Sequence, residues 1–352
     1  MTCISATECV SPREIGAFLA RLSPDYRPTP LLDLPRLADG LRVAQVWAKD
    51  ESRRVLGSFK SLGGTYAGLR ALARHAGCSP DDLLDRKAAG LPTLTCASDG
   101  NHGLAVAYAA QLAGGPARIF LHKGVPDWRA DRIAALGAQV TRVSGTYDDA
   151  VDEAAASAKR DGLVLISDTS ADPADPVVAD VMAGYGVIAT EIQDEIDRAG
   201  KEPPTHLFVQ AGVGGLAAAL AEGLAGWMAP PGRIVVVEPE AAACVAAAFA
   251  ADAIVRLPGE LDTAAEMLSC GEASAPAVSI LRRHGTGAVQ VSEAELAAAP
   301  GLLGRCGGPT TSPSGGTGLA GLVRAASTMR DEYALDAGSR VLLILSEGVE
   351  RG

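Results

Sequence analysis

The stretch HLFVQAGVGGLAAALAEGL, residues 206–224, contains the elements that decide the fold. It starts with a short apolar run that lacks the alternation of a half-exposed strand, as expected for a strand covered on both faces. Gly212-Val213-Gly214-Gly215 then leads into an Ala- and Leu-rich segment with helical spacing. A strand that passes through glycines into a helix is the unit from which parallel α/β sheets are built.

The same alternation of strand and helix patterns extends outward along most of the chain. Further strand-like runs lie at residues 43–48, 93–96, 118–121, 139–143, 163–166, 233–237 and 341–345. Helical patterns lie between them at residues 103–112, 128–136, 147–160 and 181–199. We therefore predict an α/β protein whose parallel sheets are covered by helices and whose ligands bind beyond the carboxyl ends of the strands.

The composition is that of a globular protein and excludes several kinds of partner. A length of 352 residues predicts about two domains, and 48% hydrophobic residues provide a sizeable core. The 31 basic and 42 acidic residues give a net charge of −11, and aromatics are only 4%. We therefore expect no nucleic-acid or membrane partner. The N-terminus lacks a signal-peptide pattern and the cysteines lack metal-ligand spacing, so we expect a cytoplasmic protein without a metal site.

A lysine at a helix start is the first candidate for chemistry. Gly57-Ser58-Phe59-Lys60 places a glycine turn before this lysine. The N-terminal end of a helix is positive, so it disfavours the charged form of the amine. An uncharged lysine amine is a nucleophile for carbonyl groups. Alone, the segment is better explained by an exposed helical lysine.

A second polar segment joins the strand-like run at 93–96 to a helical pattern. It reads Ser98-Asp99-Gly100-Asn101-His102-Gly103. Ser98 or Asp99 could cap the helix that follows, but capping does not account for the whole string. Asn101 offers both a donor and an acceptor at this turn.

The glycine loop of the opening stretch fits two kinds of ligand. Consecutive glycines before a helix let backbone amides approach a phosphate. The same loop, with Glu238 at the end of the next strand, is also close to a dinucleotide fingerprint, which leaves a nicotinamide-dependent dehydrogenase as an alternative. That alternative does not explain Lys60 or Asn101.

Serines complete the set. Ser312-Pro313-Ser314-Gly315-Gly316 forms one cluster, and Ser346 ends an apolar run, where its hydroxyl could meet a ring nitrogen. A lysine for an aldehyde, an asparagine for a ring hydroxyl, a glycine loop for a phosphate and a serine for a pyridine nitrogen together specify pyridoxal phosphate.

The chain resembles the fold-type II pyridoxal-phosphate enzymes, the tryptophan synthase β and threonine dehydratase superfamily. Within it the chain is most similar to the diaminopropionate ammonia-lyases. The strings that carry this resemblance are Ala48-Lys49-Asp50-Glu51-Ser52, Phe59-Lys60, Asp99-Gly100-Asn101-His102-Gly103, Asp168-Thr169, Gln210-Ala211-Gly212-Val213-Gly214, Val237-Glu238-Pro239, Cys270-Gly271-Glu272 and Glu347-Gly348. The aspartate before Gly-Asn-His-Gly and the Cys-Gly-Glu string are particular to the ammonia-lyases.

The resemblance implies a reaction and a role for each candidate residue. The reaction is α,β-elimination of 2,3-diaminopropionate to pyruvate and ammonia. Lys60, Asp99 and Asp168 are implied as catalytic residues, with Lys60 bound to the cofactor as a Schiff base. The implied cofactor-binding residues are Lys60, Phe59, Asn101, Gly212, Val213, Gly214, Gly215 and Ser346. The implied substrate-binding residues are Ser98, Asp99, Gly100, His102, Asp168 and Ser314.

The resemblance also implies an architecture. It predicts a homodimer of two-domain subunits with the active site in the interdomain cleft. The large domain is expected at residues 1–62 and 186–352 and the small domain at 63–185. A disulfide between Cys244 and Cys270, which the family can form, is an open expectation.

Two departures from the family pattern bear on the substrate. The loop Ser170–Pro176 lacks aromatic residues, and Pro313 stands where the family often has an acid. Serine or threonine dehydration, or β-replacement in a biosynthetic pathway, therefore remains an alternative with the same cofactor. A protein that binds the cofactor without turnover is another.

Overall fold

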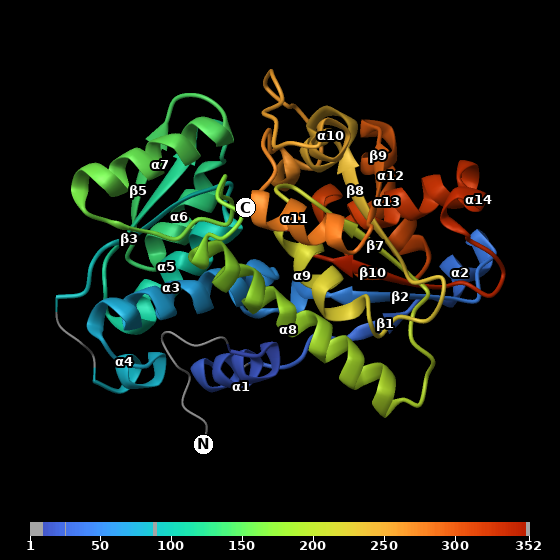
Figure 1. Cartoon of the computed structure of the whole chain (residues 1–352), viewed down its shortest axis with the longest axis horizontal. Coiled ribbons are helices and arrows are strands. Elements are labelled where there is room, and N and C mark those ends of the chain that lie inside the picture. Colours follow the sequence, from blue (N-terminus) through green and yellow to red (C-terminus); the bar gives the residue numbers. More distant parts are fainter. Residues whose placement is uncertain (1–9, 25, 87–89, 350–352) are drawn as a thin grey trace. The chain divides into compact units, whose positions relative to one another are not determined.

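The structure is a computed structural model that describes residues 10–24, 26–86 and 90–349. The chain divides into two compact units, which are named here by their sheets (Figure 1). The four-stranded unit contains the described residues of 10–26 and 60–187, and the six-stranded unit contains 27–59 and 188–349. Helix α1 (Pro12–Leu22) thus belongs to the four-stranded unit, although we expected residues 1–62 in the large domain. The expected domain division stays a prediction.

The six-stranded unit contains a sheet with the strand order β1-β2-β10-β7-β8-β9. Its strands are β1 (Leu31–Asp33), β2 (Gln45–Asp50), β7 (His206–Gln210), β8 (Arg233–Pro239), β9 (Gly287–Val291) and β10 (Arg340–Leu345). All neighbours pair in parallel except β1, which runs antiparallel to β2. The predicted α/β class is confirmed, with β1 and β9 as additional strands. A three-residue strand and a strand that starts with glycine give too little pattern to be detected.

Helices cover this sheet and bury its apolar side chains. They are α2 (Pro35–Leu41), α9 (Gly215–Leu224), α10 (Cys244–Ala251), α11 (Ala275–Arg283), α12 (Glu293–Arg305), α13 (Pro313–Thr328) and α14 (Arg330–Tyr333). One continuous core joins Val235, Val237 and Leu343 of the strands to leucines of α12 and α13. Burying each such side chain contributes about 1.5–3 kcal/mol, which anchors the strand ends that carry the candidate residues.

The four-stranded unit contains a fully parallel sheet with the order β5-β4-β3-β6. Its strands are β3 (Leu94–Ser98), β4 (Ala117–His122), β5 (Gln139–Val143) and β6 (Val164–Leu165). Its other helices are α3 (Lys60–Ala76), α4 (Pro80–Arg86), α5 (Asn101–Ala113), α6 (Asp127–Ala135) and α7 (Tyr147–Asp161). Helix α8 (Pro176–Arg198) begins in this unit and ends in the other.

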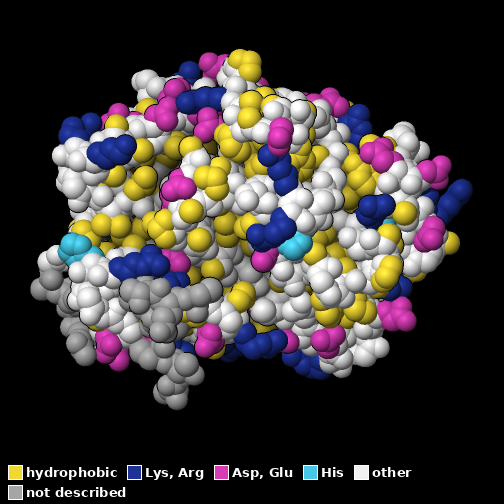
Figure 2. Space-filling model, viewed as in Figure 1, with side chains coloured by type: hydrophobic (Ala, Val, Ile, Leu, Met, Phe, Trp, Pro, Cys, Tyr) yellow, Lys and Arg dark blue, Asp and Glu magenta, His cyan; other side chains and the backbone are white. Residues whose placement is uncertain are grey.

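Surface charge and helix composition can be compared with the expectation of no nucleic-acid or membrane partner. On the face drawn in Figure 2, Lys and Arg side chains are interspersed with Asp and Glu. Within the described ranges, no helix combines the length and the apolar character that a membrane crossing requires.

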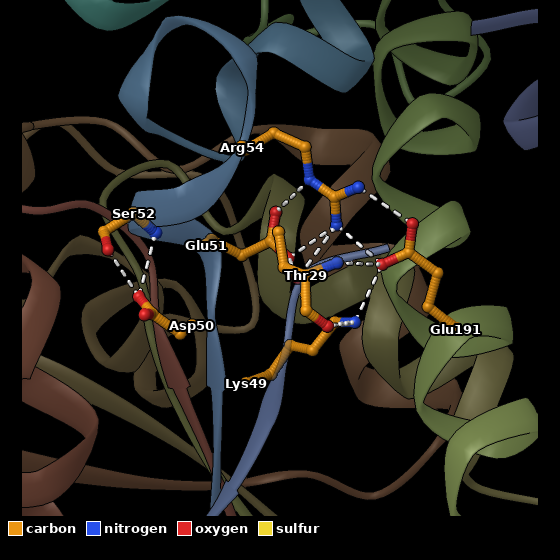
Figure 3. Close-up of polar contacts among 7 residues, drawn as sticks. All are labelled: Thr29, Lys49, Asp50, Glu51, Ser52, Arg54 and Glu191. Carbon is orange, nitrogen blue, oxygen red and sulfur yellow. Dashed lines mark hydrogen bonds and ion pairs between the residues drawn. The ribbon is translucent and has the colours of Figure 1, made fainter. Parts of the chain in front are cut away.

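A buried cluster of two cations and two carboxylates lies in the six-stranded unit (Figure 3). Arg54 donates to both carboxylate oxygens of Glu51 and to both of Glu191, at 2.7–2.9 Å. Lys49 Nζ lies 2.7 Å from Glu191 Oε2 and donates to Thr29 O at 2.6 Å. The side chains of Lys49 and Glu51 are completely buried. Because every charge has an opposite partner, the cluster joins β2, the turn after it and α8 without a net buried charge.

We predict that Glu191→Gln lowers the free energy of unfolding by about 3–5 kcal/mol. The substitution leaves Lys49 and Arg54 with one buried carboxylate between them, and an uncompensated buried charge costs that much. Chemical denaturation at neutral pH measures the loss. The control is Glu222→Gln, which removes an exposed carboxylate paired with Arg283 and is expected to cost less than about 1 kcal/mol. Equal losses in the two variants would contradict the role of the buried cluster.

Candidate active site

Lys60 is the first residue of α3, as the sequence predicted, and its amine pairs with Asp168. The turn before it is tight, with positive φ at Leu56 (68°) and Gly57 (85°). Phe59 N donates to Ser346 O at 3.2 Å, so the residue before the lysine is attached to the end of β10. This bond fixes where α3 begins.

Asp168 is held from two sides. It accepts from the Lys60 amine and, at 3.2 Å, from the Tyr147 hydroxyl. Burial favours its neutral form, but the charge of Lys60 and the two hydrogen bonds outweigh this and hold the pKa of Asp168 well below its usual range. The site therefore presents a carboxylate that already binds an ammonium group.

Small residues let α3 and α5 pack closely, so that Lys60 and Asn101 lie at adjacent helix starts. A Cβ at Gly64 would lie 2.7 Å from Ala105 Cβ, and a Cβ at Gly68 would lie 2.7 Å from Ala109 Cβ. Helices α3 and α5 therefore touch at two successive turns and run in the same direction. Lys60 is one turn before Gly64, and Asn101 is one turn before Ala105. Both helices thus begin side by side, which the sequence could not show because the contact depends on packing between distant segments.

The turn before α5 is built by Ser98. Its hydroxyl accepts from Gly100 N at 2.9 Å and from Gly103 N at 2.8 Å, so it satisfies amides of the first turn in place of a cap. The helix cap itself is Gly100, with φ 142°, which an L side chain rarely adopts. His102 is buried, and its Nε2 lies 2.7 Å from Ile166 O, so this nitrogen carries the proton.

Asp99 lies beside a residue that sequence analysis missed. Only 10% of its side chain is exposed, and its Oδ1 lies 3.0 Å from Nε2 of His122. Burial raises the pKa of Asp99, whereas His122 and, to a lesser extent, Lys60 oppose this rise. Two carboxylates, Asp99 and Asp168, are therefore in the electrostatic range of Lys60, and one of them is biased toward the neutral form.

The glycine loop lies in the six-stranded unit at the start of α9, between β7 and that helix. Its helix cap is Gly214, with φ 97°, and in the described part of the chain no side chain caps the helix. Because no described side chain caps this helix, its first amides are available as donors to an anion. A Cβ at Gly212 would lie 3.1 Å from Cys270 Sγ, so a side chain there would crowd the loop.

Cys244 and Cys270 both approach this loop. Cys244 Sγ donates to Gly212 O at 3.2 Å, and Cys270 contacts the same glycine. Both side chains are thiols in the structure, so the disulfide that the resemblance allows is not formed here. The two thiols instead pack against the backbone that shapes the glycine loop.

The remaining candidates in this unit have distinct surroundings. Ser346 is buried directly after β10. Ser314 is also buried, and its hydroxyl accepts from Met267 N at 3.1 Å. Glu238, the acid of the dinucleotide alternative, accepts from Val245 N and Ala246 N at the start of α10. Its carboxylate is used to hold a helix, so it does not offer a ribose contact.

Sequence analysis missed three residues as site residues: Tyr147, which contacts Asp168, Tyr185, which lies near Lys60, and His122, which lies beside Asp99. Lys60 Nζ lies 6.0 Å from the centroid of the Tyr185 ring, and burial raises the pKa of that phenol. The sole sequence signal was scarcity, because the chain has only 6 tyrosines and 5 histidines.

These donors fit pyridoxal phosphate. The amides at the start of α9 suit its phosphate, because no described side chain caps the N-terminus of this helix. A lysine amine such as that of Lys60 can bind an aldehyde, and a buried serine hydroxyl such as that of Ser346 can meet a ring nitrogen.

Comparison with known proteins agrees with this assignment. The family model described as "Pyridoxal-phosphate dependent enzyme" matches residues 22–347. The diaminopropionate ammonia-lyase of Escherichia coli (strain K12) is 32% identical over 92% of this chain and 85% of its own length. The crystal structure of the Escherichia coli enzyme with an aminoacrylate-PLP azomethine reaction intermediate superposes with a TM-score of 0.86, at 29% identity, over 99% of this chain and 91% of that one. The processed form of threonine deaminase isoform 2 from Solanum lycopersicum gives a TM-score of 0.73 at 26% identity, over 100% of this chain and 93% of that one.

We predict that Asp168→Asn lowers the free energy of unfolding of the cofactor-free protein by about 1–3 kcal/mol at pH 7. The pKa of Asp168 is lower in the folded than in the unfolded protein, so its contribution is complete above the unfolded value and is lost as pH falls through the folded one. The difference between wild type and variant should therefore shrink below about pH 4. Urea denaturation across this pH range measures it. A difference that stays constant would show that the ion pair with Lys60 contributes nothing.

Proposed function

This chain belongs to the pyridoxal-phosphate dependent enzyme family, and we propose that it catalyses α,β-elimination of 2,3-diaminopropionate to pyruvate and ammonia. The observation that carries the proposal is the pairing of Asp168 with the Lys60 amine, with Asp99 as a second carboxylate nearby. A substrate with two ammonium groups needs a counter-charge in addition to a base. The similarity to diaminopropionate ammonia-lyases supports the same assignment.

We propose a cofactor-binding role for each residue that the sequence selected. Lys60 would bind its aldehyde, with Phe59 beside it, and Asn101 would meet its ring hydroxyl. Gly212, Val213, Gly214 and Gly215 would hold its phosphate through backbone amides, and Ser346 would face its ring nitrogen. When bound, pyridoxal phosphate acts as an electron sink that stabilises negative charge at the substrate α-carbon.

The chain's own residues then move the proton and hold the substrate. Lys60 would take the α-proton of one isomer and Asp99 that of the other, because an enzyme that handles both isomers needs a base on each face. Asp168 would bind the distal ammonium of the substrate, a role supported by its contact with the Lys60 ammonium. Burial that excludes water strengthens this charge pairing.

The turn before α5 would bind the substrate carboxylate. Ser98 shapes this turn by accepting from the amides of Gly100 and Gly103, and burial lowers the pKa of His102, which favours its neutral form. Ser314 would add a further contact to the substrate. Fixing the carboxylate orients the bond from which the α-proton is taken.

A second candidate keeps the cofactor and changes the substrate. The loop between β6 and α8 has no aromatic side chain at residues 170–176, where the ammonia-lyases usually have one. A serine or threonine dehydratase, or a β-replacement enzyme, would tolerate that loop. The dehydrogenase alternative loses its support because Glu238 holds α10.

Assembly and location follow from the same resemblance. We propose a homodimer in the cytoplasm, each subunit having a large domain at residues 1–62 and 186–352 and a small domain at residues 63–185. The five cysteines of the described residues are thiols, which is compatible with a reducing compartment. Light scattering of the purified protein measures the oligomer.

We predict that the purified protein has the visible absorption of bound pyridoxal phosphate and that D- or L-2,3-diaminopropionate shifts it while pyruvate accumulates. Lys60→Ala should abolish pyruvate formation, because it removes the amine that binds the cofactor. A spectrophotometer records both signals in one cuvette. A protein that forms pyruvate from serine or threonine instead would favour the dehydratase, and one that binds no pyridoxal phosphate would refute the cofactor.

We also predict that Asp99→Asn keeps the cofactor spectrum but lowers turnover of one isomer by about 10²–10⁴-fold. Asparagine preserves the shape of the side chain and removes the base. Separate measurement of kcat and KM with the D- and L-substrates tests this. Full activity on both isomers would mean that Asp99 is not the base.

A further inference from the structure

We propose that His122 is the residue that positions Asp99 and favours its ionised form, so that it serves the turnover of a single substrate isomer. The inference rests on the proposed function, in which Asp99 takes the α-proton of one isomer. Sequence analysis did not select His122, and none of the roles assigned above includes it.

Sheet register brings the two residues together. Strands β3 and β4 pair in parallel, with Ser98 opposite Leu121. Asp99 directly follows β3 and His122 is the last residue of β4, so both lie at the edge where ligands of parallel sheets bind. Their Oδ1 and Nε2 atoms are 3.0 Å apart, although the two groups are not aligned as a hydrogen bond. Such contacts in active sites without substrate are often misaligned and tighten when substrate binds.

The backbone fixes which nitrogen of His122 carries the proton. Gly124 N donates to Nδ1 of His122 at 3.1 Å, so Nδ1 is an acceptor. The proton of the neutral ring is therefore on Nε2, the atom that faces Asp99. A Cβ at position 124 would lie 2.8 Å from Cε1 of the ring, so glycine permits this close approach.

The contact with His122 affects the ionisation of Asp99. Burial pushes Asp99 toward its neutral form, which cannot accept a proton. His122 is the leading group that favours the carboxylate, ahead of Lys60, while Asp168 acts in the opposite sense. Arg129 of α6 also faces this turn, and its Nη1 lies 3.5 Å from Asp99 O. One quarter of the His122 side chain is exposed, so the pair has access to water for proton exchange.

The experiment compares His122→Ala with His122→Gln in the holoenzyme. Glutamine can place a donor near the position of Nε2, and alanine cannot. We expect His122→Ala to lower kcat/KM for one isomer by about 10- to 100-fold, with the other isomer within about twofold, and His122→Gln to recover part of the loss. The low-pH limb of kcat/KM for the affected isomer should move to higher pH in His122→Ala, because Asp99 loses the group that opposes its raised pKa.

Two controls separate positioning from general damage. His284→Ala breaks another histidine–carboxylate pair, with Nε2 2.8 Å from Glu222 Oε2, and should change neither isomer. The double variant Asp99→Asn/His122→Ala should be no worse than Asp99→Asn alone, since His122 acts through Asp99. Equal losses on both isomers, no loss on either, or additive losses in the double variant would overturn the inference.

Nitrogen NMR gives a readout that does not depend on turnover. The chain has 5 histidines, so His122→Gln identifies the His122 signals by difference. We expect the Nε2–H form in the wild type, with an Nε2 shift that changes in Asp99→Asn. An Nδ1–H form, or no response to Asp99→Asn, would overturn the inference. If wild-type protein forms no pyruvate from either isomer, the proposed function itself fails and the inference falls with it.

Discussion

The structure depends on how a buried set of charges holds the chain just before Lys60. Four charged side chains are buried there, and each cation has a carboxylate within 2.7–2.9 Å: Lys49, Glu51, Arg54 and Glu191 (Figure 3). Desolvation of any one of them alone would cost several kcal/mol. The set fastens the end of β2 to α8 and shapes the turn that leads to Lys60. The backbone just before Lys60 is thus held by buried charges.

A backbone hydrogen bond then fixes the residue that precedes Lys60. Phe59 is hydrogen-bonded to Ser346 at the end of β10, so the lysine helix begins at a defined point. The α3–α5 contact through Gly64 and Gly68 then sets Asn101 at the level of Lys60. Glycines matter here because a larger residue at either position would separate the two helices.

Around Lys60 the chain places two carboxylates with opposite tendencies. Asp168 is held ionised by Lys60, whereas burial pushes Asp99 toward its neutral form and His122 opposes that push. Two titratable groups with diverging pKa values are the usual basis for dividing acid–base roles in an active site. Here the division comes from neighbours that lie far apart in the sequence.

The sequence by itself determined the α/β class, most strand positions and the residues that point to pyridoxal phosphate. These depend on local order: β7 and the glycine loop appear as one continuous pattern, and Lys60 starts its helix where the turn before it predicts. Only the tertiary structure decided that Asp168 pairs with Lys60 and that Glu238 holds α10. It also decided that Tyr147 contacts Asp168, that Tyr185 lies near Lys60 and that His122 lies beside Asp99. Such contacts join residues far apart in the chain through helix packing and strand register, and neither leaves a periodic signal in one sequence.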